Sequence, residues 1–312
     1  MMSAAVRVFQ RRPDLVPSLA VAASSALWGL FWIPMRAIND AGVSVAWSGP
    51  VVFLCVVTAF LPFALWRWRN FLKSDAEFWI ACGLAGLAFT LYAASFNLTD
   101  VVRAMLLFYL SPVWSTILGV LVLGERLTVN RILAVGLGLG GLVVVLGGGN
   151  EFPWPRGIGD WFALASGFAW ALASVRFFQG GAALLFEKTY GFGLCALVSA
   201  VVIAVLPFDM DSTLPDPSAF KILWPWLMVV TVFLLPALFF VIWPATVLSP
   251  VRVGILFMTE AVVGVVSAAL LTDETFGFRE LAGTLMIMGA GAVELIRPQP
   301  VKTDKQDTAH VA

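Results

Sequence analysis

One acidic residue lies deep inside an apolar stretch of this sequence. Glu260 is about ten residues into the run 250–271, which corresponds to about 15 Å of helix at 1.5 Å per residue. A charged side chain at the centre of a bilayer costs about 2.5–3.5 kcal/mol on insertion scales, so an acid retained there indicates a functional site by default. Glu260 could exchange a proton or bind a substrate ammonium group. The alternative is a neutral carboxyl group that is hydrogen-bonded to a neighbouring helix.

Two tyrosines and a proline in nearby apolar runs could contribute to the same site. Tyr92 and Tyr109 lie within adjacent runs, and a tyrosine hydroxyl in apolar surroundings needs a polar partner or water. Pro112 frees the carbonyl group of Phe108, and the small Ser111 lies beside it. Such irregular backbone is tolerated within a membrane where it lines a cavity or contacts protein. We therefore expect this neighbourhood either to line a cavity or to pack against another helix.

Tryptophans near the centres of the first and sixth runs could complete an aromatic cage. Trp28 and Trp170, together with Tyr109, would suit an amphipathic solute with a hydrophobic or aromatic part. They could equally pack between helices or against lipid. Arg36, near the end of the first run, could snorkel to the interface or bind a carboxylate in an outer vestibule. The predicted substrate-binding residues are Tyr109, Trp170, Tyr92, Trp28, Glu260, Ser111 and Pro112.

The residues that common catalytic and cofactor sites require are missing from the interior of the sequence. The single histidine, His310, lies near the C-terminus, which argues against a Ser/His dyad, an H-E-x-x-H zinc site or bis-histidine haem. Cys55, Cys82 and Cys195 are far apart in apolar runs and form no C-x-x-C or disulfide pattern. We expect no cofactor, no metal and no enzymatic activity.

The composition places these residues in a membrane protein. The chain has 312 residues, of which 60% are hydrophobic and 12% charged, whereas a soluble domain carries about 25% charged residues. The mean hydropathy is +0.93. This composition excludes an ordinary soluble enzyme, a disordered protein and a nucleic-acid binder. The net charge is zero, so no charge excess indicates an acidic or basic partner.

Ten apolar stretches have the length of about 20 residues that a membrane-spanning helix needs. The predicted spans are 18–38, 44–66, 77–97, 103–123, 130–148, 159–180, 187–207, 222–245, 250–271 and 279–297. The fold class that follows is an all-α membrane protein of ten transmembrane helices.

Basic residues in the connecting loops predict the orientation of these spans. With a cytoplasmic N-terminus, the 14 inside cations are Arg7, Arg11, Arg12, Arg67, Arg69, Lys73, Arg126, Arg131, Arg176, Lys188, Arg252, Arg297, Lys302 and Lys305. The 5 outside cations are Arg36, Arg103, Arg156, Lys221 and Arg279. Because positive charge accumulates on the cytoplasmic side of a membrane, the bias predicts that both termini are cytoplasmic.

The chain divides into two predicted halves of five spans each. We expect an N-terminal segment 1–17, a first repeat 18–148, a linker 149–158, a second repeat 159–297 and a disordered cytoplasmic tail 298–312. An odd number of spans in each half inverts the second half relative to the first, as in many secondary transporters. Two alignments without gaps support the relation weakly. One pairs Glu125 with Glu274, and the other pairs Trp28 with Trp170.

Several short stretches resemble the EamA-type repeat, which defines the ten-helix branch of the drug/metabolite transporter superfamily. They are 26–29 (ALWG), 110–113 (LSPV), 118–128 (LGVLVLGERLT), 136–141 (GLGLGG), 259–262 (TEAV) and 273–275 (DET). Ala261 stands where this pattern usually has proline. Within the superfamily the sequence is most similar to YddG-type amino-acid exporters. The resemblance implies two inverted repeats and a substrate site between them, and a glutamate is frequent in the family at the position of Glu260.

The resulting hypothesis is a secondary transporter in a bacterial inner membrane. It would export small metabolites, above all aromatic or other neutral amino acids, by alternating access through a central cavity. One alternative is a facilitative uniporter or channel-like permease for other small metabolites. Another is a membrane-embedded lipid enzyme, for which Asp273, Glu274 and Glu280 form an acidic cluster without metal-ligand spacing. The expected partners are a small-molecule substrate and membrane lipid, with no nucleic acid; a monomer and a dimer are both open.

Overall fold

The computed structural model describes residues 13–99, 101–145, 155–181, 184–208, 213–214, 220–271 and 277–296. This part of the chain is almost entirely helical and contains no strand. Its helices are α2 (Leu15–Trp28), α3 (Trp32–Asp40), α4 (Val45–Trp66), α5 (Trp68–Leu72), α6 (Ala76–Leu98), α7 (Val101–Phe108), α8 (Ser111–Leu123), α9 (Val129–Val145), α10 (Ile158–Gly180), α11 (Leu185–Val205), α12 (Phe220–Val247), α13 (Pro250–Phe257), α14 (Thr259–Leu271) and α15 (Phe278–Ile296).

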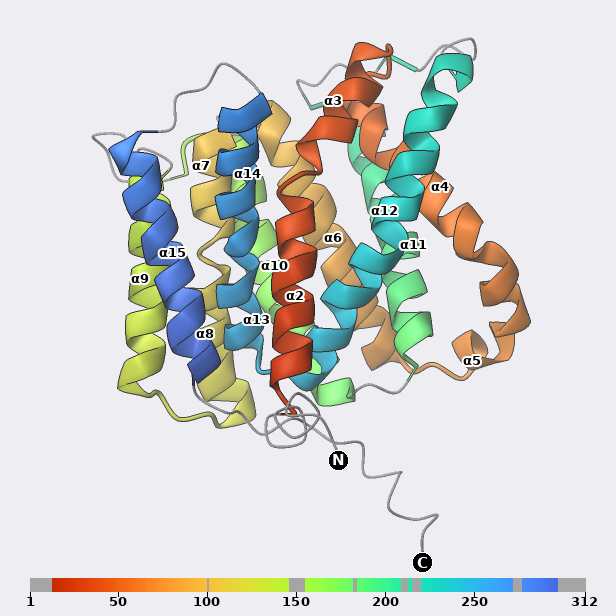
Figure 1. The fold of residues 1–312 in the computed structure, drawn as a ribbon. Coiled ribbons are helices and arrows are strands. Elements are labelled where there is room, and N and C mark those ends of the chain that lie inside the picture. The colour runs from red at the N-terminus through yellow and green to blue at the C-terminus, as the bar shows by residue number, and fades with distance from the viewer. Residues whose placement is uncertain are drawn as a thin grey trace, which may run out of the picture.

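The helices stand side by side in one bundle (Figure 1). α2 begins and α15 ends at the lower end of the bundle in this view, which we call the basal end. α3 ends and α4 begins at the opposite, upper end. The chain rises through α2 and descends through α10, so the first helices of the two predicted halves run in opposite directions. An inverted arrangement requires this difference in direction.

Six helical segments in the described part of the chain are long and apolar enough to cross a membrane. They are Leu15–Asp40, Val45–Trp66, Ala76–Phe96, Ile158–Gly180, Leu185–Val205 and Lys221–Val247. Shorter apolar helices at Ser111–Leu123, Val129–Val144 and Leu281–Val293 lie within three of the other predicted spans. The protein is thus a multi-pass helical membrane protein. The count of ten spans stays a prediction.

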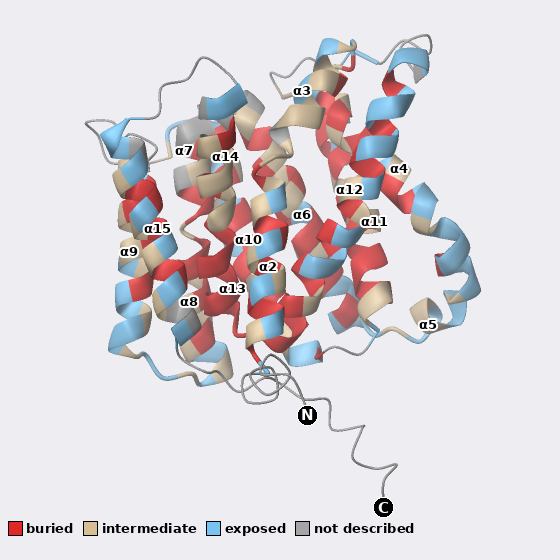
Figure 2. Cartoon of the chain, viewed as in Figure 1, coloured by how far each residue is buried: buried red, intermediate tan, exposed pale blue. Residues whose placement is uncertain are grey.

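The outer surface of the bundle carries large apolar side chains. Leu121 on α8 and Leu270 on α14 are 76% and 78% exposed, and Figure 2 shows buried residues concentrated on the inward faces of the helices. So much exposed apolar surface would be unfavourable in water. Lipid tails cover such side chains at no comparable cost, while each helix satisfies its own backbone hydrogen bonds.

Two of the helical segments are interrupted at corresponding positions. α7 ends at Phe108 and α13 ends at Phe257, and each of these helices has 8 residues. Each is followed at once by a helix of 13 residues, α8 or α14. The first interruption coincides with Pro112, near the start of α8. The second interruption contains no proline. There the two helices are separated by a tighter turn at Met258, whose amide donates to the carbonyl of Ile255 at 3.2 Å.

Glycine allows α9 and α15 to lie in close contact. A Cβ atom added at Gly141 would lie 2.7 Å from the carbonyl oxygen of Gly283 and 2.9 Å from side-chain atoms of Met286 and Ile287. A Cβ atom at Gly136, five residues earlier on α9, would meet nothing within 4 Å. The close approach of the two helices therefore depends on Gly141 and not on every glycine of the run.

Some predicted segments lie outside the described residues. These are the N-terminal residues 1–12, most of the linker 149–158, the tail 298–312, and Asp273 and Glu274 of the acidic cluster. The side chain of Glu280 is likewise not described. The predicted domain boundaries and the cluster stay predictions.

We predict that Gly141→Ala destabilises the purified protein by about 1–3 kcal/mol, because the added methyl group overpacks a contact with a neighbouring backbone. Gly136→Ala is the matched control in the same helix, and it should be neutral or stabilising by up to about 1 kcal/mol through helix propensity. Thermal unfolding in detergent measures both effects. Equal unfolding temperatures for the two variants would contradict the packing shown here.

Candidate binding cavity

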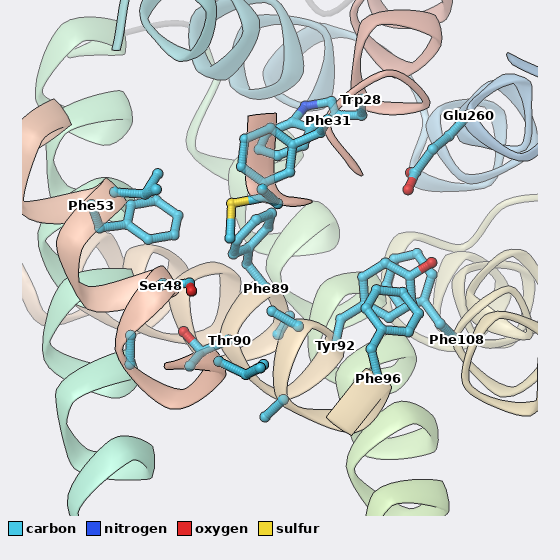
Figure 3. A pocket seen from close by; sticks show the side chains of 18 of the residues that line it. Trp28, Phe31, Ser48, Phe53, Phe89, Thr90, Tyr92, Phe96, Phe108 and Glu260 are labelled. Atoms are coloured by element: carbon cyan, nitrogen blue, oxygen red, sulfur yellow. The ribbon is translucent and has the colours of Figure 1, made fainter. Parts of the chain in front are cut away.

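A cavity of about 860 Å³ occupies the centre of the bundle. Its lining comes from α2 and α3, α4, α6, α7, α10, α11, α12, α13 and α14. At the upper end it includes Arg36 and Val45, which are both exposed. Lining residues from the basal ends of the helices are absent from the described cavity wall. The cavity therefore extends from mid-bundle to the upper end, and Figure 3 shows part of it.

A backbone contact at Gly29 positions the acid of this cavity. Gly29 follows the last residue of α2, and a Cβ atom placed there would lie 2.5 Å from the carbonyl oxygen of Glu260 and 2.8 Å from the amide nitrogen of Gly264. Only glycine allows α2 and α14 to approach so closely. Glu260 lies in the first turn of α14, where the positive end of the helix dipole favours a negative charge.

The polar groups around Glu260 are only partly satisfied by the protein. Glu260 forms no ion pair with any residue that the structure describes, and its carboxyl group points toward Tyr92 in Figure 3. The Tyr109 hydroxyl group interacts with the Glu260 carboxyl group and with the Tyr92 hydroxyl group, although neither contact reaches full hydrogen-bond geometry. The indole nitrogen of Trp170 is buried without a hydrogen-bond partner among the described residues. Unsatisfied buried donors are costly. A polar ligand or water in the cavity would satisfy those that line it.

Aromatic rings form much of the remaining wall. Tyr92 stacks on Phe108 with ring centroids 4.0 Å apart, and Trp170 packs against Phe257 at 5.1 Å. Phe108 and Phe257 are the last residues of α7 and α13, so the two helix interruptions each place one phenylalanine against an aromatic partner at the cavity. Aromatic surfaces of this kind suit an apolar or aromatic solute.

Further phenylalanines that sequence reasoning did not single out extend the aromatic wall. Phe89 packs against Trp28 and Phe53 with centroids 5.1 Å away in both cases, and Phe192 lies 6.3 Å from Phe53 and from Phe89. All four residues line the cavity. Because 25 phenylalanines are spread through the apolar runs, their spacing gives no signal that separates these three from ordinary packing residues.

The structure divides the predicted site residues into two groups. Trp28, Tyr92, Trp170 and Glu260 line the cavity together. The other three, Tyr109, Ser111 and Pro112, are buried in the described bundle but do not line it.

The packing of α8 against α13 explains why Ser111 and Pro112 lie behind the wall. The ring of Pro112 faces α13, where Gly254 leaves room for it, so the irregular turn packs against protein. This is the second of the two placements that we expected for this neighbourhood. Any part these three residues have in substrate binding stays a prediction.

A buried ion pair lies at the basal end, below the cavity. Arg252 Nη1 lies 2.8 Å from Asp14 Oδ2, and both side chains have 0% exposure. Arg252 is the third residue of α13, so this cation, which was counted with the cytoplasmic loops, lies in the first turn of a helix at the basal end. Its position next to the helix start at Pro250 makes a loop and a first turn hard to distinguish from sequence.

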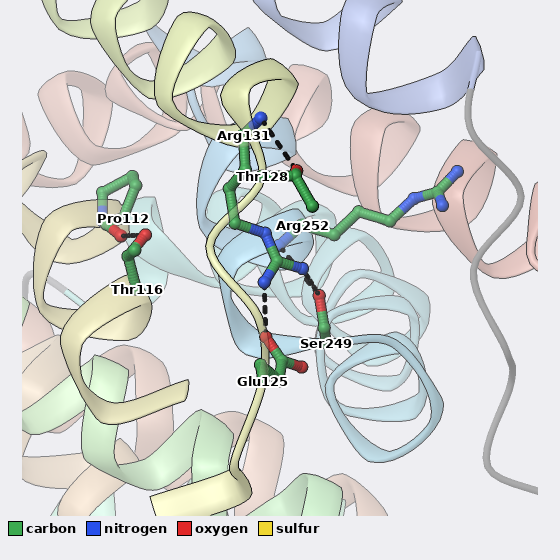
Figure 4. Close-up of polar contacts among 7 residues, drawn as sticks. All are labelled: Pro112, Thr116, Glu125, Thr128, Arg131, Ser249 and Arg252. Carbon is green, nitrogen blue, oxygen red and sulfur yellow. Dashed lines mark hydrogen bonds and ion pairs between the residues drawn. The ribbon is translucent and has the colours of Figure 1, made fainter. Parts of the chain in front are cut away.

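A second ion pair closes the same region of the bundle (Figure 4). Arg131 donates from Nη1 to Glu125 Oε2 at 2.6 Å and from Nη2 to Ser249 Oγ at 3.4 Å. These contacts connect Arg131, at the start of α9, both to the segment that precedes α9 and to the residue that caps α13. In the structure Glu125 therefore has a structural role.

Comparison with known proteins finds a transporter family over the first half of the chain. Residues 16–147 match the EamA-like transporter family. Protein RarD from Streptomyces exfoliatus is 33% identical over 138 residues, which are 41% of this chain and 42% of that protein. The chain thus aligns with less than half the length of this relative. The chain is also similar to a protein of known crystal structure, with a TM-score of 0.69 and 19% sequence identity. The match covers 90% of this chain and 98% of the other chain, which shows a common fold.

We predict that Tyr92→Phe leaves the unfolding temperature of the ligand-free protein unchanged or raises it. The substitution removes a buried hydroxyl group that forms no hydrogen bond of full geometry and keeps the ring stacked on Phe108. Tyr92→Ala, which also removes the stacking, should lower the free energy of unfolding by about 3–5 kcal/mol. Thermal unfolding in detergent provides the measurement. A marked loss of stability in Tyr92→Phe would mean that the hydroxyl group is satisfied.

Proposed function

We propose that this protein is a secondary transporter that exports small metabolites by alternating access through the central cavity. In this proposal the whole chain belongs to the EamA-type branch of the drug/metabolite transporter superfamily, with ten membrane spans in two inverted repeats. The observation that carries the proposal is an acid without a cationic partner among the described residues, Glu260, in the wall of a cavity inside a membrane protein. Intramembrane acids of this kind are typical of substrate and ion pathways.

Three observations support the inverted repeats. α7 and α13 have equal lengths and end at Phe108 and Phe257, which are 149 residues apart. α2 and α10 run in opposite directions through the bundle. The family match at residues 16–147 ends near residue 148, where the first predicted repeat ends. A site at the interface of two such repeats can be exposed to either side of the membrane by a rocking movement.

Amino acids are the proposed substrates, with aromatic and other neutral ones preferred. Glu260 could pair with the ammonium group, and the rings of Trp28, Tyr92 and Trp170 could contact a hydrophobic side chain. A volume of about 860 Å³ is within the range of about 300–1,000 Å³ that is typical of small-molecule pockets. The resemblance of the sequence to YddG-type exporters supports the same substrate class.

The proposed location is the bacterial inner membrane with both termini in the cytoplasm. The loop cations number 14 on one side and 5 on the other in the ten-span arrangement, and the first described helix begins at the same end of the bundle at which the last one ends. The basal end would then face the cytoplasm and the cavity would open toward the periplasm. The structure would correspond to an outward-facing state.

Transport by reconstituted liposomes tests the role of Glu260. We predict saturable uptake of labelled phenylalanine that a pH gradient accelerates, and loss of this acceleration in Glu260→Gln, because the amide cannot exchange a proton. Glu77→Gln is the matched control, since Glu77 is 59% exposed at the basal end and pairs there with Arg176.

Further outcomes separate the alternatives. Saturable uptake that is insensitive both to pH and to Glu260→Gln would indicate a facilitative permease and a structural role for Glu260. A failure of every amino acid to enter the liposomes would exclude the proposed substrate class.

A further inference from the structure

Two charged side chains of opposite sign are present in the described wall of the cavity. Glu260 lies at mid-bundle and Arg36 lies at the upper end, on α3. Arg36 follows Gly29, which contacts the backbone of Glu260, by seven positions. At a helical rise of 1.5 Å per residue, this corresponds to about 10 Å along the bundle. Arg36 is exposed and has no ion-pair partner among the described residues.

A second donor lies on the same face of α3 as Arg36. Asn39 follows Arg36 by three residues, and positions i and i+3 of a helix are neighbours on its surface. The Ser48 hydroxyl donates to Asn39 Oδ1 at 2.5 Å. The carboxamide oxygen of Asn39 accepts this bond, so its NH2 group remains as a hydrogen-bond donor. Asn39 and Ser48 both line the cavity.

Together these residues form a set of donors suited to a carboxylate. A guanidinium group offers a planar fork of N–H donors, and charge-assisted hydrogen bonds to a carboxylate are about twice as strong as neutral ones. The surrounding wall is mostly apolar, which strengthens the electrostatic interaction relative to bulk water. Glu260 lies too deep to pair with Arg36 by direct contact in this state.

We propose that Arg36, assisted by Asn39, is a specificity-determining residue that binds the substrate carboxylate and orients the substrate with its ammonium group toward Glu260. This inference rests on the proposed transport of amino acids. It explains how a largely apolar cavity would select an amino acid over an amine of the same shape. The orientation also places the apolar side chain of the substrate among the aromatic rings of the wall.

Binding of three related compounds tests the inference. L-Phenylalanine carries both charges, phenethylamine lacks the carboxylate and 3-phenylpropionate lacks the ammonium group. Their affinities for the purified protein would be measured by tryptophan fluorescence and checked by calorimetry. We expect Arg36→Gln to weaken L-phenylalanine binding about tenfold and to leave phenethylamine binding unchanged. Glu260→Gln should weaken phenethylamine binding and leave 3-phenylpropionate binding unchanged.

The controls separate this inference from the proposed function. Lys221→Gln removes another exposed cation at the upper end that does not line the cavity, and it should change no affinity. If the wild type binds phenylalanine and Arg36→Gln binds it equally well, the role of Arg36 is overturned but the proposed substrate class is not. Absence of binding of all three compounds to the wild type would overturn the proposed substrate class and this inference together.

A second inference, which rests on the proposed alternating access but on a different observation, concerns the Asp14–Arg252 pair. Asp14 precedes α2 and Arg252 is in the first turn of α13, so the pair connects the basal ends of two helices. Both helices end at the depth of the cavity, at Trp28 and Phe257. The Arg252 amide is further held by Ser249 Oγ at 3.4 Å, so the start of α13 is fixed.

We infer that this ion pair keeps the cavity closed at the basal end. We call the pair the latch, and the contact of α2 with α13 that it holds the basal gate. For the cavity to open at the basal end, α2 and α13 must separate, and the pair must then break. Two charges with 0% exposure can separate only if water reaches both. A vestibule that opens to the basal side supplies that water, so the latch breaks only together with gate opening. Removal of one partner leaves a buried charge uncompensated and should favour the open, hydrated arrangement.

Accessibility of a cysteine from each side of the membrane tests the latch. Cys55, Cys82 and Cys195 would be replaced by alanine, and Ala93→Cys, in the cavity wall, would report labelling by an impermeant maleimide. A C-terminal tag identifies the face that carries the terminus. We expect Asp14→Asn to reduce labelling from the opposite face and to increase labelling from the tagged face.

Two further variants keep the test decisive if Asp14→Asn folds poorly. The exchange Asp14→Arg with Arg252→Asp keeps a pair in place and should restore the wild-type labelling pattern at least in part. Glu77→Gln breaks an exposed pair at the same end and should leave the pattern unchanged. An unchanged pattern in Asp14→Asn, or the same change in Glu77→Gln, would overturn the latch.

Discussion

The backbone contact between Gly29 and Glu260 sets the geometry of the cavity. A Cβ atom at position 29 would lie 2.5 Å from the carbonyl oxygen of Glu260. Any residue other than glycine would therefore force α2 and α14 apart. The contact holds the start of α14, and with it the carboxyl group, beside the end of α2. Trp28 immediately precedes this point, so the same contact brings the indole ring to the cavity. A wider separation would move the acid away from the aromatic wall.

The helix interruptions solve a common problem in a membrane. Every carbonyl and amide group that leaves a helix in lipid must find another partner or be enclosed by protein. At the interruption after α7, the carbonyl oxygen of Phe108 faces Gly167 of α10, where a Cβ atom would come within 2.5 Å. At the interruption between α13 and α14, Gly29 faces the backbone of Glu260. In both cases a glycine on a neighbouring helix lets protein cover the irregular backbone at the depth of the cavity.

Hydropathy predicted the positions of the helices well, because an apolar run of about 20 residues rarely forms anything but a membrane-spanning helix. Pro112 likewise predicted the interruption after α7, since proline removes a helical hydrogen bond. The interruption at Met258 could not be predicted in this way, because Ala261 stands where a proline would signal it. The deep position of Glu260 in the structure agrees with its place in the sequence.

The side-chain directions were less predictable than the helices. Tyr109 is 0% exposed and outside the cavity lining, while its hydroxyl group interacts with the carboxyl group of Glu260. The sequence does not specify this direction, since the rotation of a helix about its own axis depends on its neighbours. Arg252 carries a charge that is normally found in loops near a span end, and only its contact with Asp14 shows that it is buried. Residues that are more than 200 positions apart, such as these two, show nothing in the neighbouring sequence that would predict their contact.

The size of the cavity has a consequence for the solvent. At about 30 Å³ for each molecule in the liquid, a space of about 860 Å³ has room for about 29 waters. If the cavity closes around a solute, many of these molecules must leave it, and they return when it opens. Osmolytes too large to enter would draw this water out and favour the collapsed form. The conformational equilibrium of the protein is thereby coupled to the water activity of the compartment that the cavity faces.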